Sequence, residues 1–218
     1  NLPIHLELYD SFGAQRAAIA AGKVDLIYAN PFDASLLVRE KGFQAIARPE
    51  GQPDEMVIVT AADHPANEIP DLKPGTRVAC SEDPCVNTVG RILLEPANLG
   101  TDNTVELRRE TYIQVARAIM RGEADVGFLP VAAFEALSSL VKRDLRILVT
   151  SQLHVIHHVF LVGPALHERA EEIAALLTAM HETEKGRGIL EALGAHRWQA
   201  VHQEDVEFMI DIISTLTQ

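Results

Sequence analysis

The chain has 218 residues, of which 47% are hydrophobic and 23% are charged, proportions that exclude a disordered or low-complexity protein. Its formal net charge of -12 at pH 7 argues against nucleic acid or an anionic membrane surface as a partner, because such a charge is repelled by phosphate groups. No apolar run has the length of a membrane span, and no signal peptide is recognisable. The sequence therefore indicates a globular protein that binds neither nucleic acid nor a membrane surface.

The first third of the chain alternates between strand and helix patterns. A strand is predicted at residues 4–9, followed by Ser11 as N-cap of a helix at about 12–21, which Gly22 ends. A buried strand at 24–28 and a helix at 32–41 that stops at Gly42 come next, and then a strand at 56–60. The proline-rich residues 65–74 cannot form a regular element, so the first hinge is predicted at about 73–78.

The same alternation continues through the rest of the chain. Strands are predicted at residues 76–80, 105–108, 124–129, 145–150 and 154–162, and helices at about 90–94, 113–121, 131–140, 167–183, 186–193 and 205–216. Strands that alternate with helices are typical of sheets covered by helices on both faces, so we expect an α/β protein with mostly parallel sheets.

One segment of the first series recurs a hundred residues later. Residues 18–25 read AIAAGKVD and residues 118–125 read AIMRGEAD, and each copy runs into an apolar strand that ends at a proline, Pro31 or Pro130. The repeat favours two similar α/β lobes whose strand ends face a shared cleft. Asp25 and Asp125 each follow the end of a helix, where they are expected to bind local backbone N–H groups.

A set of short motifs in fixed order resembles the phosphonate-binding family of periplasmic solute receptors. They are residues 22–30 (GKVDLIYAN), the strand at 57–59 with Pro65 and residues 71–73, the Asp83-Pro84 loop, residues 122–125 and the C-terminal run 188–194. The resemblance implies the two-lobed type II periplasmic binding fold, with residues 1–75 and 152–218 in lobe I, residues 76–151 in lobe II, and a second hinge at 148–152. The family usually begins with a further strand and helix before residue 4, which this sequence does not show.

The resemblance also indicates which residues contact the ligand. The family binds its anion on a Ser-rich turn at a helix N-terminus, and the corresponding stretch here offers Cys85, Asn87 and Thr88. The aromatic pair of lobe I corresponds to Phe12 and Tyr28. Further predicted contacts are Asn30, Tyr112 and His157, the last two at positions where the family has other polar residues, so an aminophosphonate is not expected.

Two groups of reactive side chains leave alternatives open. Cys80 and Cys85 could form a disulfide or stay reduced, and a free Cys85 could bind a soft partner such as arsenite. His154, His157 and His158 form a cluster, but alternation along a strand would let only two of them converge, so no metal site is predicted.

The favoured function is an extracytoplasmic receptor that closes on a small polar solute, with an oxyanion of the phosphate or phosphonate class expected. It would be a monomer, use no cofactor or catalytic residue, and pass its ligand to an ABC permease or a membrane sensor; no GxSxG or P-loop motif indicates an enzyme. Two alternatives share the fold. They are the effector-binding domain of a LysR-type regulator, and an arsenite- or metal-sensing protein that uses Cys85.

Overall fold

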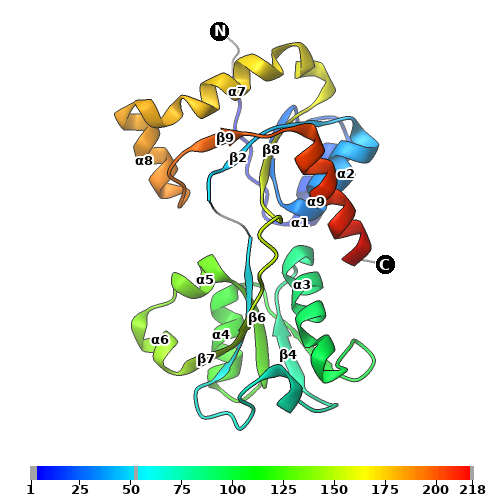
Figure 1. The fold of residues 1–218 in the computed structure, drawn as a ribbon, viewed down its shortest axis with the longest axis vertical. Coiled ribbons are helices and arrows are strands. Elements are labelled where there is room, and N and C mark those ends of the chain that lie inside the picture. The colour runs from blue at the N-terminus through cyan, green and yellow to red at the C-terminus, as the bar shows by residue number, and fades with distance from the viewer. Residues whose placement is uncertain (1–3, 52–53, 217–218) are drawn as a thin grey trace.

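The computed structural model describes residues 4–51 and 54–216, which form two lobes joined by two chain segments (Figure 1). Lobe I contains the sheet formed by β1 (Leu26–Ala29), β8 (Val159–Val162), β2 (Gln44–Pro49) and β9 (Trp198–Ala200), in that order. Lobe II contains the sheet formed by β5 (Val105–Arg108), β4 (Arg77–Cys80), β6 (Val126–Pro130), β3 (Met56–Ala61) and β7 (Leu145–Thr150), in that order. Each sheet lies among helices, as expected for the α/β class.

The helices divide between the lobes along the chain. Lobe I has α1 (Phe12–Ala20), α2 (Pro31–Lys41), α7 (Ala170–Thr178), α8 (Glu184–Ala192) and α9 (Gln203–Leu216), with the short 3-10 helices η3 (Pro164–Arg169) and η4 (Met180–Glu182). Lobe II has α3 (Pro84–Leu94), α4 (Tyr112–Met120), α5 (Val131–Glu135) and α6 (Ser139–Arg143), with η1 (Ile69–Asp71) and η2 (Glu95–Ala97).

The repeated segment forms the same unit in both lobes. Helix α1 ends before Gly22 and is followed by β1, and helix α4 ends before Gly122 and is followed by β6. Both glycines have a positive φ, 68° and 66°, which is costly for a residue with a Cβ. The predicted N-cap Ser11 is confirmed, since its side chain accepts a hydrogen bond from the N–H of Ala14.

The strand directions differ from the prediction of mostly parallel sheets. All pairings in the lobe I sheet are antiparallel, because β8 runs back from lobe II between β1 and β2. In lobe II, β4 is parallel to β5 and β6, whereas β3 is antiparallel to β6 and β7. The parallel strands β4, β5 and β6 follow one another in the chain with a helix between each pair. An alternation of strand and helix patterns in the sequence is diagnostic of this parallel arrangement.

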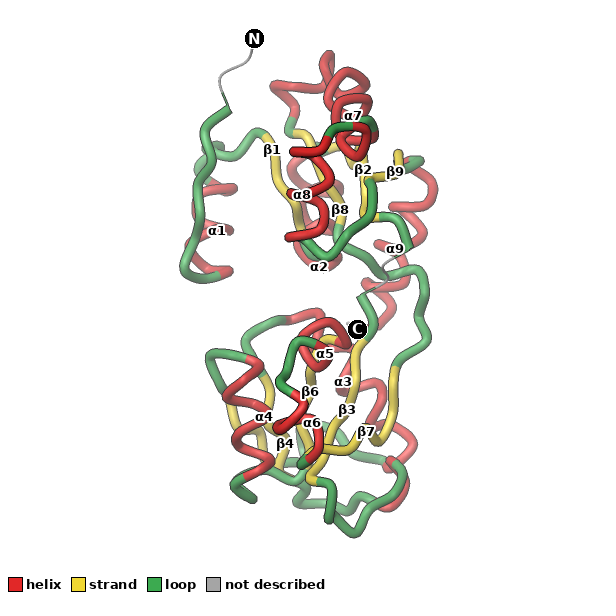
Figure 2. The backbone as a smooth tube through the Cα atoms, turned by 90° about the vertical axis from the view of Figure 1, so that its left-hand side faces the viewer, coloured by secondary structure: helices red, strands yellow, loops and turns green. Residues whose placement is uncertain are grey.

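The first crossing between the lobes lies earlier than predicted. Strand β3 pairs with β6 and β7, so the chain has already entered lobe II at Met56. The predicted hinge at 73–78 and the predicted lobe boundary at residue 75 therefore lie after the observed crossing. The second crossing runs from the end of β7 to the start of β8, and the predicted hinge at 148–152 covers its beginning. Figure 2 shows the two crossing segments together at one side, away from α1.

The predicted strand at residues 4–9 is not formed. Ile4, Leu6 and Leu8 are 80%, 79% and 87% exposed, and this segment runs outside the lobe I sheet (Figure 2). Alternating apolar residues predict a half-buried strand, but a strand also needs a neighbouring edge for its backbone groups, and residues 4–9 pair with no strand in the described part of the chain.

Helix α9 packs against the cores of both lobes. Met209 and Ile210 are buried in the lobe I core beside Val159 and Leu161, whereas Ile213 is buried in a cluster of lobe II residues that includes Phe128. Figure 1 shows α9 running from lobe I towards α3. The C-terminal helix therefore packs on lobe I, as predicted, and also reaches lobe II.

Close packing between α3 and β6 generates the first prediction. A Cβ at Gly90 of α3 would lie 2.5 Å from atoms of the fully buried Phe128 ring, so Gly90→Ala should lower the free energy of unfolding by about 1 to 3 kcal/mol in urea titrations. Gly188→Ala in α8 is the matched control, because its Cβ would meet nothing within 4 Å, and it should leave stability unchanged or raise it by up to about 1 kcal/mol. Equal stability of the two variants would contradict this packing.

Candidate functional site

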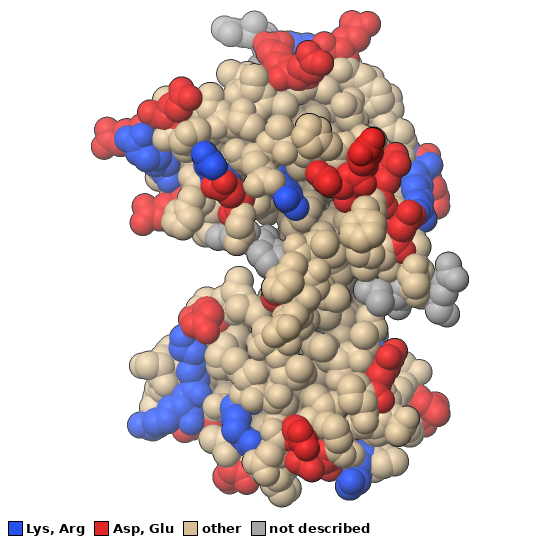
Figure 3. Space-filling view, in the orientation of Figure 1, with Lys and Arg blue, Asp and Glu red and all other residues tan. Residues whose placement is uncertain are grey.

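A cavity of about 1030 Å³ lies between the lobes. Its lobe I wall is the segment that leads into α1, and its lobe II wall consists of the loops that lead into α3 and α4. Among the residues that the structure describes, the lining includes the carboxylates of Glu7, Asp10, Glu82, Asp83 and Glu110, and neither lysine nor arginine. Figure 3 shows the narrow waist that joins the two lobes. This cleft is the candidate ligand site, and its lining is acidic.

The N-terminus of α3 is occupied by the side chain of Asp83. Its Oδ1 accepts hydrogen bonds from the backbone N–H groups of Cys85 at 2.9 Å and Val86 at 3.3 Å. Pro84 at the first helical position has no N–H to donate. The donors with which a helix N-terminus would bind an anion are therefore already bound to a carboxylate of the same chain.

Tyr112 lies on the other side of the same carboxylate. Its hydroxyl donates a hydrogen bond to Oδ2 of Asp83 at 3.0 Å, which joins the start of α4 to the start of α3. Burial and the charge of Asp83 raise the pKa of Tyr112, so the hydroxyl stays protonated and acts as a donor. The predicted contact Tyr112 thus lines the cleft, and Asp83 holds its ring in position.

The N-terminus of α2 has a similar arrangement in lobe I. The predicted contact Asn30 is buried, and its Oδ1 caps α2 by accepting from the N–H of Asp33 at 2.9 Å. Its Nδ2 donates to the Asp33 carboxylate at 2.7 Å, and Nε of Arg16 lies 2.6 Å from the same carboxylate. Asn30 therefore stabilises the helix start, with both ends of its amide already bonded to Asp33.

Two phenylalanines enclose Arg16. The Arg16 guanidinium lies 5.8 Å from the ring centroid of Phe12 and 5.5 Å from that of Phe32, within the range of cation–π attraction. Phe12, a predicted contact, also lines the cleft. Arg16 was not predicted to lie at the site, because no signal in the local sequence indicates its pairing with Asp33, seventeen residues away.

The ring of Tyr28 contacts that of His158, whereas the histidine predicted as a ligand contact is His157. The ring of Tyr28 lies 5.2 Å from that of His158, whose side chain is 36% exposed, and 5.3 Å from the Trp198 ring. His157 is only 3% exposed, and burial and the charge of Arg48 lower its pKa, so it is a neutral, buried group. Its burial argues against the predicted ligand contact.

The strand predicted over residues 154–162 forms only in part. Strand β8 begins only at Val159, and His154 has a left-handed backbone with φ of 53°. The alternation rule for side chains in a strand therefore does not apply to the histidines. No signal in the sequence distinguishes His158 from His157.

The remaining predicted contacts lie on α3. Asn87 donates a hydrogen bond from Nδ2 to the backbone oxygen of Ser81 at 2.9 Å, and Thr88 is half-buried on the same helix. Cys80 and Cys85 are both free and buried. Burial and the charges of Asp83 and Asp54 raise the pKa of the Cys85 thiol, so it is protonated and poorly suited to bind a thiophilic ion.

Within residues 4–51 and 54–216, no three His, Cys, Asp or Glu side chains are grouped so that they could hold a metal ion.

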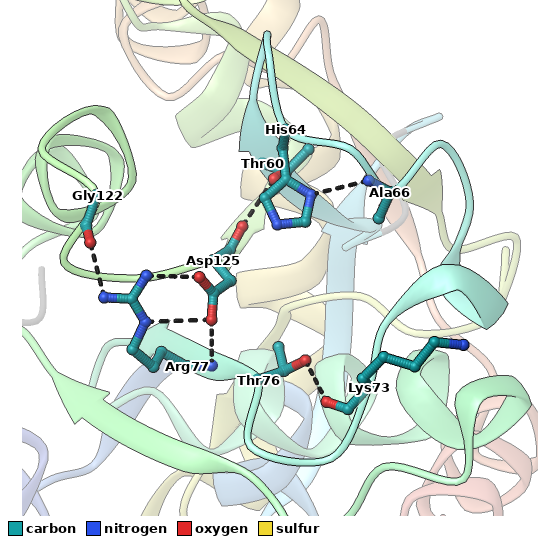
Figure 4. Close-up of polar contacts among 8 residues, drawn as sticks. All are labelled: Thr60, His64, Ala66, Lys73, Thr76, Arg77, Gly122 and Asp125. Atoms are coloured by element: carbon teal, nitrogen blue, oxygen red, sulfur yellow. Dashed lines mark hydrogen bonds and ion pairs between the residues drawn. The ribbon is translucent and has the colours of Figure 1, made fainter.

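A second cavity, of about 530 Å³, lies elsewhere on lobe II, between the loop at residues 64–76 and Asp125 (Figure 4). Asp125 accepts hydrogen bonds from the backbone N–H of Arg77 at 2.8 Å and from its guanidinium at 2.6 Å. Asp125 has a structural role, as predicted, but the backbone N–H that it binds is that of Arg77, 48 residues away, rather than a local one, and the contact ties the start of β4 to the start of β6.

The solved structures that resemble this chain share its two-lobed architecture. PhnD1 from Prochlorococcus marinus in complex with methylphosphonate is 14% identical, with a TM-score of 0.78 over 94% of this chain and 82% of that chain. A Xanthomonas citri protein bound to chloride is 16% identical, with a TM-score of 0.75 over 93% and 81%. The aliphatic sulphonate binding protein SsuA from Escherichia coli is 16% identical, with a TM-score of 0.62 over 92% and 73%. The fold is therefore that of the type II periplasmic binding proteins.

The family follows from the sequence itself. The model of the family described as ABC transporter, phosphonate, periplasmic substrate-binding protein matches residues 1–206, and the chain belongs to this family. No curated protein matches the chain. None of the helices in the described part of the chain combines the length and apolarity needed to cross a membrane.

The acidic N-cap of α3 generates the second prediction. Asp83→Asn keeps an oxygen that can cap the helix but removes the negative charge, so an oxyanion such as methylphosphonate should bind roughly three- to tenfold more tightly, as measured by isothermal titration calorimetry. Asp63→Asn removes the same charge from an exposed turn after β3 and should leave affinity unchanged. An equal effect of the two substitutions would assign the change to net charge rather than to the cleft.

Proposed function

We propose that the chain is an extracytoplasmic solute-binding protein that closes its two lobes on a small polar solute. The observation that carries the proposal is the cavity between the lobes, onto which the starts of α1, α3 and α4 converge. Ligand sites at the boundary between two lobes allow closure to bury the ligand from both sides. Membership of a substrate-binding family supports this role.

The ligand class that the family supports is an oxyanion of the phosphate or phosphonate type. The related PhnD1 structure contains methylphosphonate, and the related SsuA is named for aliphatic sulphonates. In this chain the backbone N–H groups at the start of α3 that could bind an anion are bonded to Asp83. An oxyanion would therefore form more of its hydrogen bonds with side chains than with that helix end. The protein would act by binding alone, as a monomer without a cofactor, and deliver its solute to an ABC permease or a membrane sensor.

Thermal unfolding against a ligand panel tests this function. The panel contains phosphate, phosphite, methylphosphonate, sulfate, arsenite and zinc, each with and without reductant. A ligand at a hundred times its dissociation constant stabilises the folded state by about 2.7 kcal/mol, which should raise the unfolding midpoint by roughly 5 to 10 °C. We expect a tetrahedral oxyanion to produce this shift whether or not reductant is present.

Small-angle X-ray scattering with the same ligand should show a smaller radius of gyration, because closure brings the lobes together. A shift only with arsenite or zinc under reducing conditions would instead identify Cys85 and the histidines as the site. Stabilisation without any compaction would contradict the closure mechanism.

A further inference from the structure

The two walls of the cleft carry the same three kinds of side chain. Residues 10–12 (DSF) lie at the start of α1 in lobe I, residues 110–112 (ETY) lie at the start of α4 in lobe II, and all six line the cavity between the lobes. The two triplets are a hundred residues apart, the same offset as that of the repeated segments 18–25 and 118–125. Figure 2 shows α1 and α4 on the same side of the molecule, in opposite lobes. Each lobe therefore presents a carboxylate, a hydroxyl and an aromatic ring to the cleft.

The hydroxyl of each triplet caps its helix and still has a proton to donate. Oγ of Ser11 accepts a hydrogen bond from the N–H of Ala14 at 3.2 Å. Oγ1 of Thr111 accepts from the N–H of Gln114 at 3.3 Å. In both contacts the oxygen is the acceptor, and a hydroxyl has one O–H donor besides its acceptor lone pairs. Both side chains are exposed in the open cleft, so their O–H groups can donate to a solute from opposite lobes.

The carboxylates of the triplets have no partner within the described part of the chain. Neither Asp10 nor Glu110 forms a side-chain hydrogen bond or ion pair there, and the same holds for Glu82 in the loop before α3. The arginine next to Glu110 in the sequence, Arg109, is bound to Glu123 instead. An ionised carboxylate only accepts hydrogen bonds. Water supplies the donors while the cleft is open, but once closure removes this water the solute has to supply them.

An oxyanion with two negative charges does not match this lining. No lysine or arginine among the described lining residues offsets its charge, and each further negative charge on the solute increases its repulsion from the carboxylates. A singly charged oxyanion that keeps a proton avoids the second charge. Its O–H can donate a charge-assisted hydrogen bond to a carboxylate, and its other oxygens can accept from Ser11 and Thr111.

We propose that the cleft selects oxyanions that keep a proton, such as a hydrogenphosphonate, over fully ionised ones, such as a sulfonate. Asp10 and Glu110 determine this specificity, because they lie on walls that approach each other when the lobes close. A ligand without an O–H leaves both carboxylates desolvated and without a donor, which is costly. The inference rests on the proposed function and names the charge state of its ligand.

The need for a proton gives binding a pH dependence that is set by the solute. Phosphate-type groups lose their second proton near neutral pH, at about pH 6 in a phosphate monoester. Above that pH, binding of the protonated form takes up one proton, so the affinity falls by at most about tenfold per pH unit. A sulfonate has no proton to lose in this range, so its affinity has no such dependence.

Isothermal titration calorimetry with two tetrahedral ligands of the same shape tests the proposal. Methylphosphonate keeps a proton at acid pH, and methanesulfonate does not. At pH 5.5 we expect methylphosphonate to bind roughly tenfold more tightly or better, since a hydrogen bond to a charged group is lost with methanesulfonate. Towards pH 8.5 the affinity for methylphosphonate should fall by roughly three- to tenfold per unit. The monomethyl ester of methylphosphonate has one charge and no O–H at either pH, so it should bind as weakly as methanesulfonate, and it reports any titration of the protein itself.

Substitution of the two carboxylates separates contact with the ligand from a structural role. Asp10→Asn and Glu110→Gln keep an acceptor oxygen, add an N–H donor and remove a negative charge. Each should therefore strengthen the binding of methanesulfonate by roughly three- to tenfold and weaken the pH dependence of methylphosphonate binding. Asp63→Asn, in an exposed turn outside the lining of the cleft, should change neither.

Equal affinities of the unmodified chain for methylphosphonate and methanesulfonate at pH 5.5 would overturn the proposal, as would an affinity for methylphosphonate that does not change with pH. Either result would leave the receptor function intact, because an oxyanion still binds. A chain that binds neither ligand and is stabilised by no other oxyanion would instead contradict the proposed ligand class, and with it this inference.

Discussion

The carboxylate of Glu55 joins the two segments on which the arrangement of the lobes depends. It accepts hydrogen bonds from two backbone N–H groups and from the hydroxyl of Ser151, which in turn accepts from the N–H of Met56. Burial would raise the pKa of Glu55, but these donors and the nearby His154 outweigh it and lower the pKa. A mostly buried carboxylate is tolerable only with such partners, so the sequence around Ser151 must keep the turn that provides them.

The start of α3 shows how a family architecture can be kept while the chemistry of one turn changes. Solved structures at 14% to 16% identity share the two lobes, which shows that the fold tolerates extensive replacement of side chains. In this chain Asp83 supplies the negative charge that a bound anion would otherwise bring to that helix end. The same carboxylate orients Tyr112 and acts on Cys85 and His158, so a single residue affects much of the cleft.

Local features of the fold were predictable because their causes lie within a few residues. Ser11 caps a helix, Gly22 and Gly42 adopt the left-handed backbone that ends one, and the repeated segment forms the same helix–strand unit twice. Strands β2 and β9 were missed, because residues 44–49 and 198–200 carry no clear alternation and are defined by pairing with each other and with β8. Of the residues predicted to contact the ligand, Phe12 and Tyr112 line the cleft, whereas Asn30 is bonded to Asp33 and His157 is buried.

The sequence by itself determined the α/β class, the two-lobed family and most helix ends, since these depend on periodicity, capping residues and motif order. Only the tertiary structure decided that β3 belongs to lobe II and that β8 runs antiparallel between β1 and β2. It also decided that residues 4–9 lie outside the sheet and that His158, not His157, meets Tyr28 and Asp54. These outcomes depend on contacts between residues far apart in the chain, and such contacts are set by the packing of whole elements rather than by local sequence.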